Sequence, residues 1–279
     1  MKPTCNAFQL KLFAASWMVL DHIDHIPGLL PPAAAAALHV LTRCVGPLFA
    51  FLAVEGFRYT HDRRRYVLRL FGWAAVIAAG SAAYNYIADD PALALHNNII
   101  LTLALGVLML CVLAGFGRDT AVGHRPLRIA GAALLVLAAA MCAEGGAVLL
   151  PFMLITYACR ARPHLRAGLY LGFALALFAV DFVPYPTLHE ALYMLAFNSD
   201  FLFVLALPLI ACYDGTRGPG TAFAKYFFYL FYPLHLLGHW PFGPAHARIK
   251  KYPRRCLSAS LRAFLSGISL VRTFPFQYR

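Results

Sequence analysis

The sequence predicts an all-α integral membrane protein, a polytopic bundle of about nine transmembrane helices. Hydrophobic residues make up 61% of the 279 residues and charged residues only 13%, whereas soluble domains carry about 45–50% and about 25%. The basic residues stand in short clusters between long apolar runs, the pattern of loops that flank a membrane. This composition also excludes disorder, coiled coil and collagen as fold classes.

A membrane-spanning helix needs about 20 mostly apolar residues, and nine runs approach or reach that length. The first run covers 7–26, and the ionisable residues near its end are unlike a cleaved signal peptide. The fifth and sixth, 127–143 and 146–159, are short and separated by Glu144 and Gly145, so a tight hairpin and a re-entrant pair both stay open. The other six runs are 33–57, 66–87, 96–116, 167–183, 199–213 and 222–240.

The basic residues of 1–240 predict how the chain lies in the membrane. With a cytoplasmic N-terminus, 15 of these 16 residues fall on the cytoplasmic side, and the exception is Arg43 inside the second run. The opposite loops contain no Lys or Arg but hold Asp89, Asp90, Asp181, Glu190 and Asp200. Because cytoplasmic loops are enriched in Lys and Arg, we expect a multi-pass protein of the bacterial inner (plasma) membrane.

Residues 241–279 differ from the rest, with eight of the 24 basic residues and no acidic residue. We therefore divide the chain into a transmembrane domain, 1–240, and a basic tail, 241–279, which we expect to be poorly ordered. A ninth helix would place this tail outside, against the charge rule, so either the helix count is off by one or the tail is atypical. The expected surroundings are a lipid bilayer and not nucleic acid, despite the net charge of +12.

None of the seven cysteines is spaced as CxxC, and most lie inside apolar runs. This pattern is typical of buried thiols, so we predict no disulfide framework and no metal site.

Ionisable residues at membrane depth are costly and therefore mark candidate functional sites. Lys11 and His22 are eleven residues apart. On a helix, eleven residues make three full turns and about 20° of further rotation, and they rise about 16 Å along the axis. The two therefore share a face. Asp21 and His25 form an i,i+4 pair, and Asp21 is better placed to orient His25 or a residue of another helix than His22. In the predicted topology His96, Asn97, Glu144 and His235 join His22 and His25 in the outer half of the membrane.

Several of these features also have plainer interpretations. Asp21 and His22 can serve an interhelical hydrogen bond, and histidines near helix ends, such as His39, are often interfacial. The aromatic run 223–232 is typical of packing and of the membrane interface, and the loop Arg63, Arg64 and Arg65 is typical of a topology signal. The glycine turn 214–218 is only a weak signal for phosphate binding.

Seven segments, in order across about 10–237, resemble the TraX family of membrane acetyltransferases associated with conjugative pilin modification. They are 19–23 (VLDHI), 46–52 (GPLFAFL), 54–58 (VEGFR), 65–70 (RYVLRL), 96–100 (HNNII), 213–218 (YDGTRG) and 225–235 (KYFFYLFYPLH). The basic residue and histidine at Lys11 and His22 also resemble the pattern of acyltransferase type 3 proteins. The region around Glu144 matches loosely, and the tail after His239 has no counterpart.

The resemblance implies acetyl transfer from acetyl-CoA, a co-substrate rather than a bound cofactor, to the N-terminal amine of a pilin subunit or another acceptor beyond the membrane. Such a reaction needs a base and an oxyanion donor. His22 is the candidate base, while His96, Asn97 or His235 would orient it or stabilise the oxyanion. The phosphates of CoA would meet the cytoplasmic cations, which are Lys11, Arg63, Arg64, Arg65, Arg69, Arg217 and Lys225.

Arg43 and Glu55 are expected to form an ion pair that fixes the bundle. Two other functions compete with acetyl transfer, a proton-coupled transporter and a non-enzymatic subunit of a pilus or conjugation apparatus. Buried Asp and His residues also serve proton relays. The sequence contains no evident inverted repeat and no evident matched pair of glycine- or proline-broken helices, which argues against the transporter.

Overall fold

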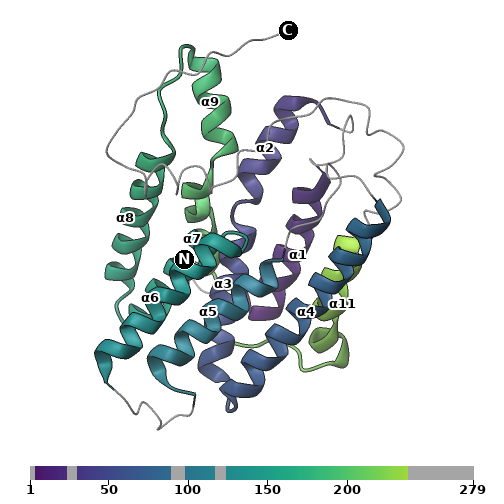
Figure 1. Cartoon of the computed structure of the whole chain (residues 1–279), viewed down its shortest axis with the longest axis vertical. Coiled ribbons are helices and arrows are strands. Elements are labelled where there is room, and N and C mark those ends of the chain that lie inside the picture. Colours follow the sequence, from purple (N-terminus) through teal and green to yellow (C-terminus); the bar gives the residue numbers. More distant parts are fainter. Residues whose placement is uncertain (1–3, 24–29, 89–97, 117–123, 238–279) are drawn as a thin grey trace. The chain divides into compact units, whose positions relative to one another are not determined.

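The structure is a computed structural model that describes residues 4–23, 30–88, 98–116 and 124–237, all within the unit Met1–Ala247. Every regular element in these ranges is a helix (Figure 1), and Cys5 and Tyr213 form one isolated parallel bridge. The elements are α1 (Ala7–Ile23), α2 (Pro32–Thr42), α3 (Val45–Tyr59), α4 (Arg63–Ala88), α5 (Ile99–Ala114), α6 (Arg125–Cys142), α7 (Gly146–Ala158), α8 (Pro163–Asp181), α9 (Leu188–Phe197), the 3-10 helix η2 (Asp200–Ala206), α10 (Leu207–Ala211) and α11 (Ala222–Leu237).

Each of the nine predicted runs coincides with helical residues, but not all helices have the length of a span. Among the described residues, four helices are long and apolar enough to cross a membrane: Ala33–Tyr59, Arg63–Tyr86, Arg125–Cys142 and Pro163–Asp181. The bent pair formed by α9 with η2 and α10 makes a fifth candidate, and α5 and α7 are apolar but shorter. The chain is thus an α-helical protein with membrane-spanning helices, while the count of nine crossings stays a prediction.

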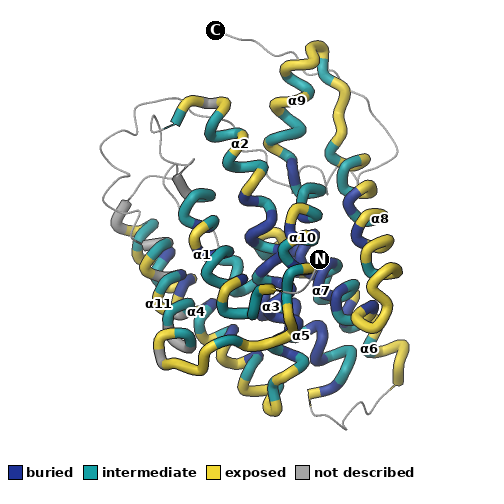
Figure 2. The backbone as a smooth tube through the Cα atoms, turned by 180° about the vertical axis from the view of Figure 1, so that it is seen from behind, coloured by how far each residue is buried: buried dark blue, intermediate teal, exposed yellow. Residues whose placement is uncertain are grey.

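The core of the bundle lies along α3, α5 and α7 (Figure 2). α3 packs against α1, α5 and α7, and its Leu48, Val54 and Phe57 are fully buried. The outward faces of α6 and α8 expose leucines such as Leu134 and Leu175, as expected for helices that face lipid. α1 is therefore held against the most buried helix of the bundle.

The second predicted run is one span interrupted between α2 and α3, at Arg43 and Cys44. Pro47 explains the interruption, because a proline has no N–H to donate to the carbonyl four residues earlier, here that of Arg43. The backbone N–H of Arg43 reaches only three residues back, to Val40.

The eighth predicted run, 199–213, is incomplete. Helix α9 precedes it and joins η2 at a bend of 61°. η2 is a 3-10 helix that ends at Ala206, and the short helix α10 follows with Pro208 in its first turn. This proline again has no N–H to donate to the carbonyl of the residue four positions earlier. The structure therefore contains two irregular spans, each with a proline just after the irregularity.

The fifth and sixth runs form two helices, α6 and α7, joined by a tight turn, while the choice between a spanning hairpin and a re-entrant pair stays a prediction. Gly145 adopts a positive φ of 63° in the turn between α6 and α7. A Cβ on Gly146 would lie 2.1 Å from the carbonyl oxygen of Ala139, so only glycine permits this approach. Thr102 of α5 donates to the carbonyl of Glu144 at 2.7 Å and holds the turn against α5.

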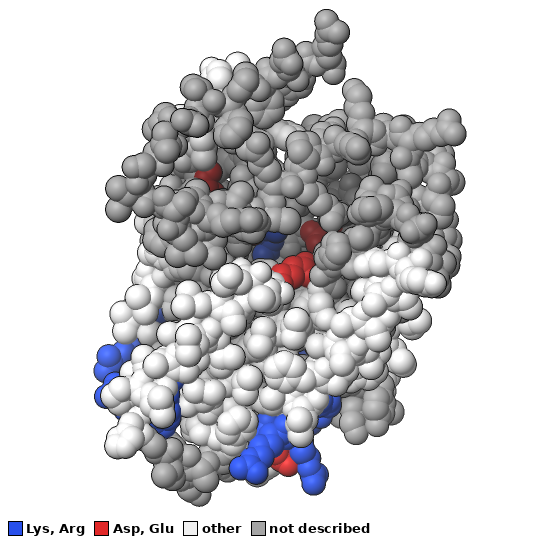
Figure 3. Space-filling view, viewed as in Figure 1, with Lys and Arg blue, Asp and Glu red and all other residues white. Residues whose placement is uncertain are grey.

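Most of the described basic side chains, with Arg43 as an exception, gather toward one end of the helices (Figure 3). We call this the basic end, formed by the turn from α3 to α4, the start of α6, the turn from α7 to α8 and the loop before α11. It carries Arg58, Arg63, Arg64, Arg65, Arg125, Arg128, Arg160, Arg162, Arg166 and Arg217. Asp181, Glu190 and Asp200 belong to the opposite end of the helices. The charge asymmetry is as predicted, while the direction of the chain in the membrane stays a prediction.

Candidate active site

The predicted pair Lys11 and His22 belongs to one uninterrupted helix, α1. The positions between them on the same face are Ala14, Ala15 and Met18, which are 0%, 3% and 5% exposed. This face is therefore turned into the bundle, where α1 packs on α3. Lys11 lies on the turn of α1 nearest the basic end and His22 on its last turn, and the side chain of His22 lies outside what the structure describes.

Three of the seven predicted CoA-binding cations form a cluster in which Arg69 and Arg217 lie within electrostatic reach of Lys11. The positive charges of Arg217 and Arg69 lie close enough to Lys11 to repel its ammonium group. The ammonium also lies 5.6 Å from the ring centre of Phe228 on α11. Since like charges are costly to hold together, this cluster favours an anionic ligand.

Three of the other predicted cations, Arg63, Arg64 and Arg65, make different contacts. Arg63 donates to the carbonyl of Gly115 at 2.9 Å and covers the end of α5. Arg64 lies 6.0 Å from the ring centre of Phe116, and Arg65 pairs with Asp62 at 3.0 Å. Lys225 is in α11, but its side chain lies outside the described part of the chain.

The turn 213–218 is bound to the start of α1. Ala7 donates its backbone N–H to the carbonyl of Thr216 at 2.9 Å, and the N–H of Asp214 donates to the carbonyl of Cys5 at 2.9 Å. The carboxylate of Asp214 accepts both the N–H and the hydroxyl of Thr216 at 2.7 Å. Because this carboxylate occupies the inside of the turn, the turn is better suited to hold Arg217 beside Lys11 than to bind phosphate with its own amides.

The predicted ion pair between Arg43 and Glu55 is wrong. Glu55 is buried and pairs with Arg58 at 2.5 Å, one turn further along α3. Arg43 pairs instead with Asp200 of η2 at 3.4 Å. Arg43 and Glu55 are twelve residues apart in one span, about 18 Å along the axis, so their side chains do not meet.

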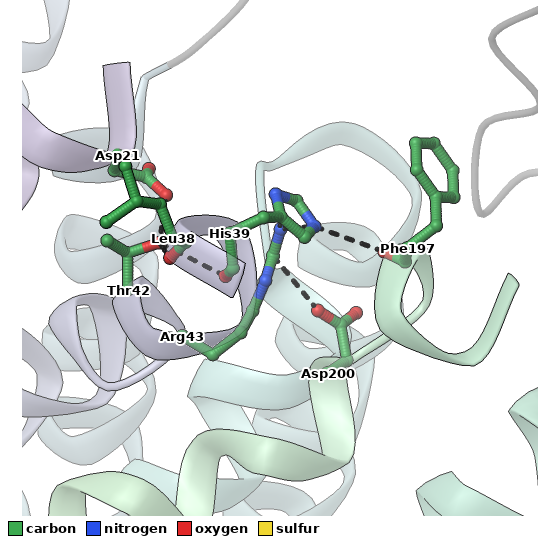
Figure 4. Close-up of polar contacts among 7 residues, drawn as sticks. All are labelled: Asp21, Leu38, His39, Thr42, Arg43, Phe197 and Asp200. Atoms are coloured by element: carbon green, nitrogen blue, oxygen red, sulfur yellow. Dashed lines mark hydrogen bonds and ion pairs between the residues drawn. The ribbon is translucent and has the colours of Figure 1, made fainter. Parts of the chain in front are cut away.

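A second polar network lies at the junction of α2 and α3, inside the candidate span Ala33–Tyr59 (Figure 4). On one side of α2, the hydroxyl of Thr42 donates to the carboxylate of Asp21 on α1. On the other side, Arg43 contacts the ring of His39 and the carboxylate of Asp200, and His39 lies 3.2 Å from the carbonyl oxygen of Phe197. In one tautomer of His39, Nδ1 accepts a hydrogen bond from Arg43. The Nε2–H of that tautomer donates to the carbonyl oxygen of Phe197.

This network bears on Asp21 directly. The side chain takes part in an interhelical hydrogen bond with α2, which agrees with the plainer interpretation and with the expectation that it meets a residue of another helix. Thr42 is 3% exposed, so the contact is shielded from water. It fixes the turn of α1 that carries His22.

The remaining predicted catalytic residues are only partly placed. His25, His96 and Asn97 lie outside the described residues. His235 stacks on Phe231 with ring centres 5.4 Å apart and ends an apolar groove along α11. Near it, the backbone N–H of Ile99 donates to the hydroxyl of Tyr232 at 3.3 Å, and Tyr232 also lies within electrostatic reach of Glu144. The start of α5, the turn after α6 and α11 therefore meet in one region.

The described part of the chain contains no group of three or more His, Cys, Asp and Glu residues arranged to hold a metal ion. Its six cysteines, Cys5, Cys44, Cys111, Cys142, Cys159 and Cys212, are free thiols.

A family model for the TraX protein matches residues 7–240, which is most of the chain. The chain belongs to the TraX family. No curated protein and no solved structure is significantly similar to it. The match covers every predicted site residue of this TraX member, and it leaves the resemblance of Lys11 and His22 to acyltransferase type 3 proteins a prediction.

Sequence reasoning treated His39 as an interfacial residue and did not connect Thr42 or Asp200 with a site. The sequence contains one signal for the contact between His39 and Arg43, because the two form an i,i+4 pair on a predicted span. Their partners Phe197 and Asp200 are more than 150 residues away in the chain, so no local pattern identifies them.

Proposed function

We propose that this TraX protein is a membrane-embedded acetyltransferase. It takes an acetyl group from cytoplasmic acetyl-CoA and transfers it to an acceptor at the outer side of the membrane, best represented by the N-terminal amine of a pilin subunit. Membership of the family supports an association with conjugation and pilin, and the apolar helices support a location in the membrane.

The observation that carries the proposal is the inward face of α1. It leads from the cation cluster at Lys11, past the small residues Ala14 and Ala15, to the turn that holds His22. CoA phosphates at Lys11, Arg69 and Arg217 would thus direct the thioester toward His22, with Arg63, Arg64, Arg65 and Lys225 available for longer-range attraction.

The packing of α11 on α1 decides which part of α1 His235 lies beside. α11 packs on α1 and starts beside it, since Phe8 meets Phe228 with ring centres 6.0 Å apart. The two helices run in the same direction from the basic end (Figure 1). His235 is seven residues after Phe228, about two turns on the same face, and this places it level with Ala15, near the middle of α1 and about two turns before His22.

In the proposed reaction, His22 accepts a proton from the acceptor ammonium, and the free amine attacks the thioester carbonyl. A C–N bond forms and the C–S bond breaks, and the CoA thiolate leaves and is protonated to the thiol. The net products are the acetylated amine, CoA thiol and one proton. His25 and Asp21 would orient the site, and His96, Asn97 or His235 would donate to the oxyanion.

The test uses the purified full-length protein in lipid nanodiscs with acetyl-CoA and a synthetic peptide that carries the N-terminus of the cognate pilin. We expect release of CoA thiol and one acetyl group on the peptide by mass spectrometry. The matched control is the same peptide with a blocked N-terminus. Absence of thiol release with folded protein, or equal release with the blocked peptide, contradicts the proposal and favours a non-enzymatic assembly role.

One observation favours a second candidate, a proton-coupled transporter. The structure contains two irregular spans with matched prolines, Pro47 and Pro208, and the ion pair Arg43–Asp200 joins them. The sequence argued against a transporter because it showed no evident matched pair of proline-broken helices. These two spans weaken that argument. Interrupted helices that meet at membrane depth are typical of transporter sites. Proton uptake by proteoliposomes that depends on Asp200, without any use of acetyl-CoA, would favour this alternative.

A further inference from the structure

The cation cluster at the basic end is adjacent to an aromatic cluster. Phe8 at the start of α1 makes edge-to-face contacts with Phe223 and Phe228 of α11, with ring centres 6.3 and 6.0 Å apart. Phe228 is in turn the ring that the Lys11 ammonium approaches. Rings and cations therefore belong to one continuous site.

The turn that carries Arg217 lies close to the start of α1, at Asn6 and Phe8. A Cβ on Gly218 would lie 2.9 Å from the Cβ of Phe8, so the chain passes directly over α1 at this point. Gly218 has a φ of 83°, a conformation that glycine adopts readily. The turn therefore passes close to Phe8, and its Arg217 lies within electrostatic reach of Lys11.

One ring of the cluster is available to a ligand. Phe223 is 61% exposed, although its edge is held by Phe8 and it packs on Phe227 with ring centres 4.9 Å apart. A nucleotide combines a flat aromatic base with phosphates, and proteins bind that combination with aromatic faces next to Lys and Arg. Phe223 is an exposed ring that connects through Phe8 and Phe228 to Lys11, and Arg69 and Arg217 lie within electrostatic reach of Lys11, so the region has this composition.

We propose that Phe223, supported by Phe8, forms an adenine-recognition subsite, with the phosphates of the same ligand on Lys11, Arg69 and Arg217. The inference rests on the proposed use of acetyl-CoA and adds to it a preference. The donor is recognised by its nucleotide end, so CoA thioesters are preferred over thioesters of pantetheine or of carrier proteins, which lack adenine.

Equilibrium binding to the full-length protein in nanodiscs tests the subsite without acetyl transfer. The probes are CoA, adenosine 3′,5′-bisphosphate, which is the nucleotide end alone, and pantetheine, which is the other end. The wild type should bind CoA and the bisphosphate, and bind pantetheine more weakly or not detectably. Phe223→Ala should weaken both nucleotide ligands about 5- to 150-fold, as for loss of one base-stacking ring, while Phe223→Tyr should retain binding.

Leu230→Ala is the matched control, since Leu230 is similarly exposed, at 57%, on the same helix and belongs to neither cluster. Thermal unfolding of each variant reports folding separately. Equal affinity of the wild type for CoA and pantetheine, or unchanged bisphosphate binding by folded Phe223→Ala, overturns the subsite and leaves Phe223 an interfacial residue. Nucleotide binding that depends on Phe223 without any acetyl transfer instead supports the subsite while contradicting the proposed reaction.

Discussion

The hairpin between α6 and α7 gives the sharpest structural prediction, through the substitution Gly146→Ala. The added Cβ would lie 2.1 Å from the carbonyl oxygen and 2.4 Å from the carbonyl carbon of Ala139. These are backbone atoms of a packed helix, so the contact is relieved only if α6 and α7 separate. Overpacking of this kind costs about 1–3 kcal/mol. At about 2–4 °C per kcal/mol, we expect the Tm to fall by roughly 2–12 °C.

The assay is thermal unfolding in detergent, followed by the exposure of buried thiols. Gly172→Ala is the matched control, because a Cβ at this position in α8 meets nothing within 4 Å. It should leave stability unchanged or raise it by about 0.5–1 kcal/mol, since alanine suits a helix better than glycine. A Gly146→Ala protein as stable as the wild type, or a Gly172→Ala protein destabilised equally, refutes the close approach of α6 and α7.

Three further predictions concern topology, the tail and the Thr42 contact. In a background without native cysteines, Arg64→Cys should be labelled only from the cytoplasm and Glu190→Cys only from outside; labelling of both from one side contradicts the topology. Truncation after Trp240, the last residue of the family match, should preserve insertion and acetyl transfer, and loss of activity in a normally expressed truncation would give the tail a role. Thr42→Val removes the donor to Asp21 and should cost about 1.5–3 kcal/mol of stability and lower turnover, while Thr42→Ser should restore both. Unchanged stability and turnover in Thr42→Val would show that this contact is dispensable.

Much of the fold follows from the sequence because apolar runs of spanning length leave few alternatives. The helical segments and the gathering of arginines at one end were predicted from composition and charge alone. The interruptions were harder to predict, because a proline ends one membrane helix and is tolerated in another. Pro47 and Pro208 adjoin irregular spans, whereas Pro151 lies inside the continuous helix α7.

The candidate site was predictable where it depends on one helix. The shared face of Lys11 and His22 follows from helical spacing, and the burial of Ala14, Ala15 and Met18 shows that this face turns inward. Contacts between distant elements were not predictable. The expected pairing of Arg43 with Glu55 failed because the choice of partner depends on how α2 meets η2, and nothing local to Arg43 identifies Asp200.

The central claim is that His22 is the base of an acetyl transfer whose donor binds at Lys11. Its most direct test is turnover per folded molecule, measured together with acetyl-CoA affinity, for His22→Ala and Lys11→Ala. We predict that His22→Ala lowers turnover by about 10²–10⁴ while acetyl-CoA binding stays nearly unchanged. Lys11→Ala should instead weaken acetyl-CoA binding. A folded His22→Ala protein with near-normal turnover would contradict the mechanism.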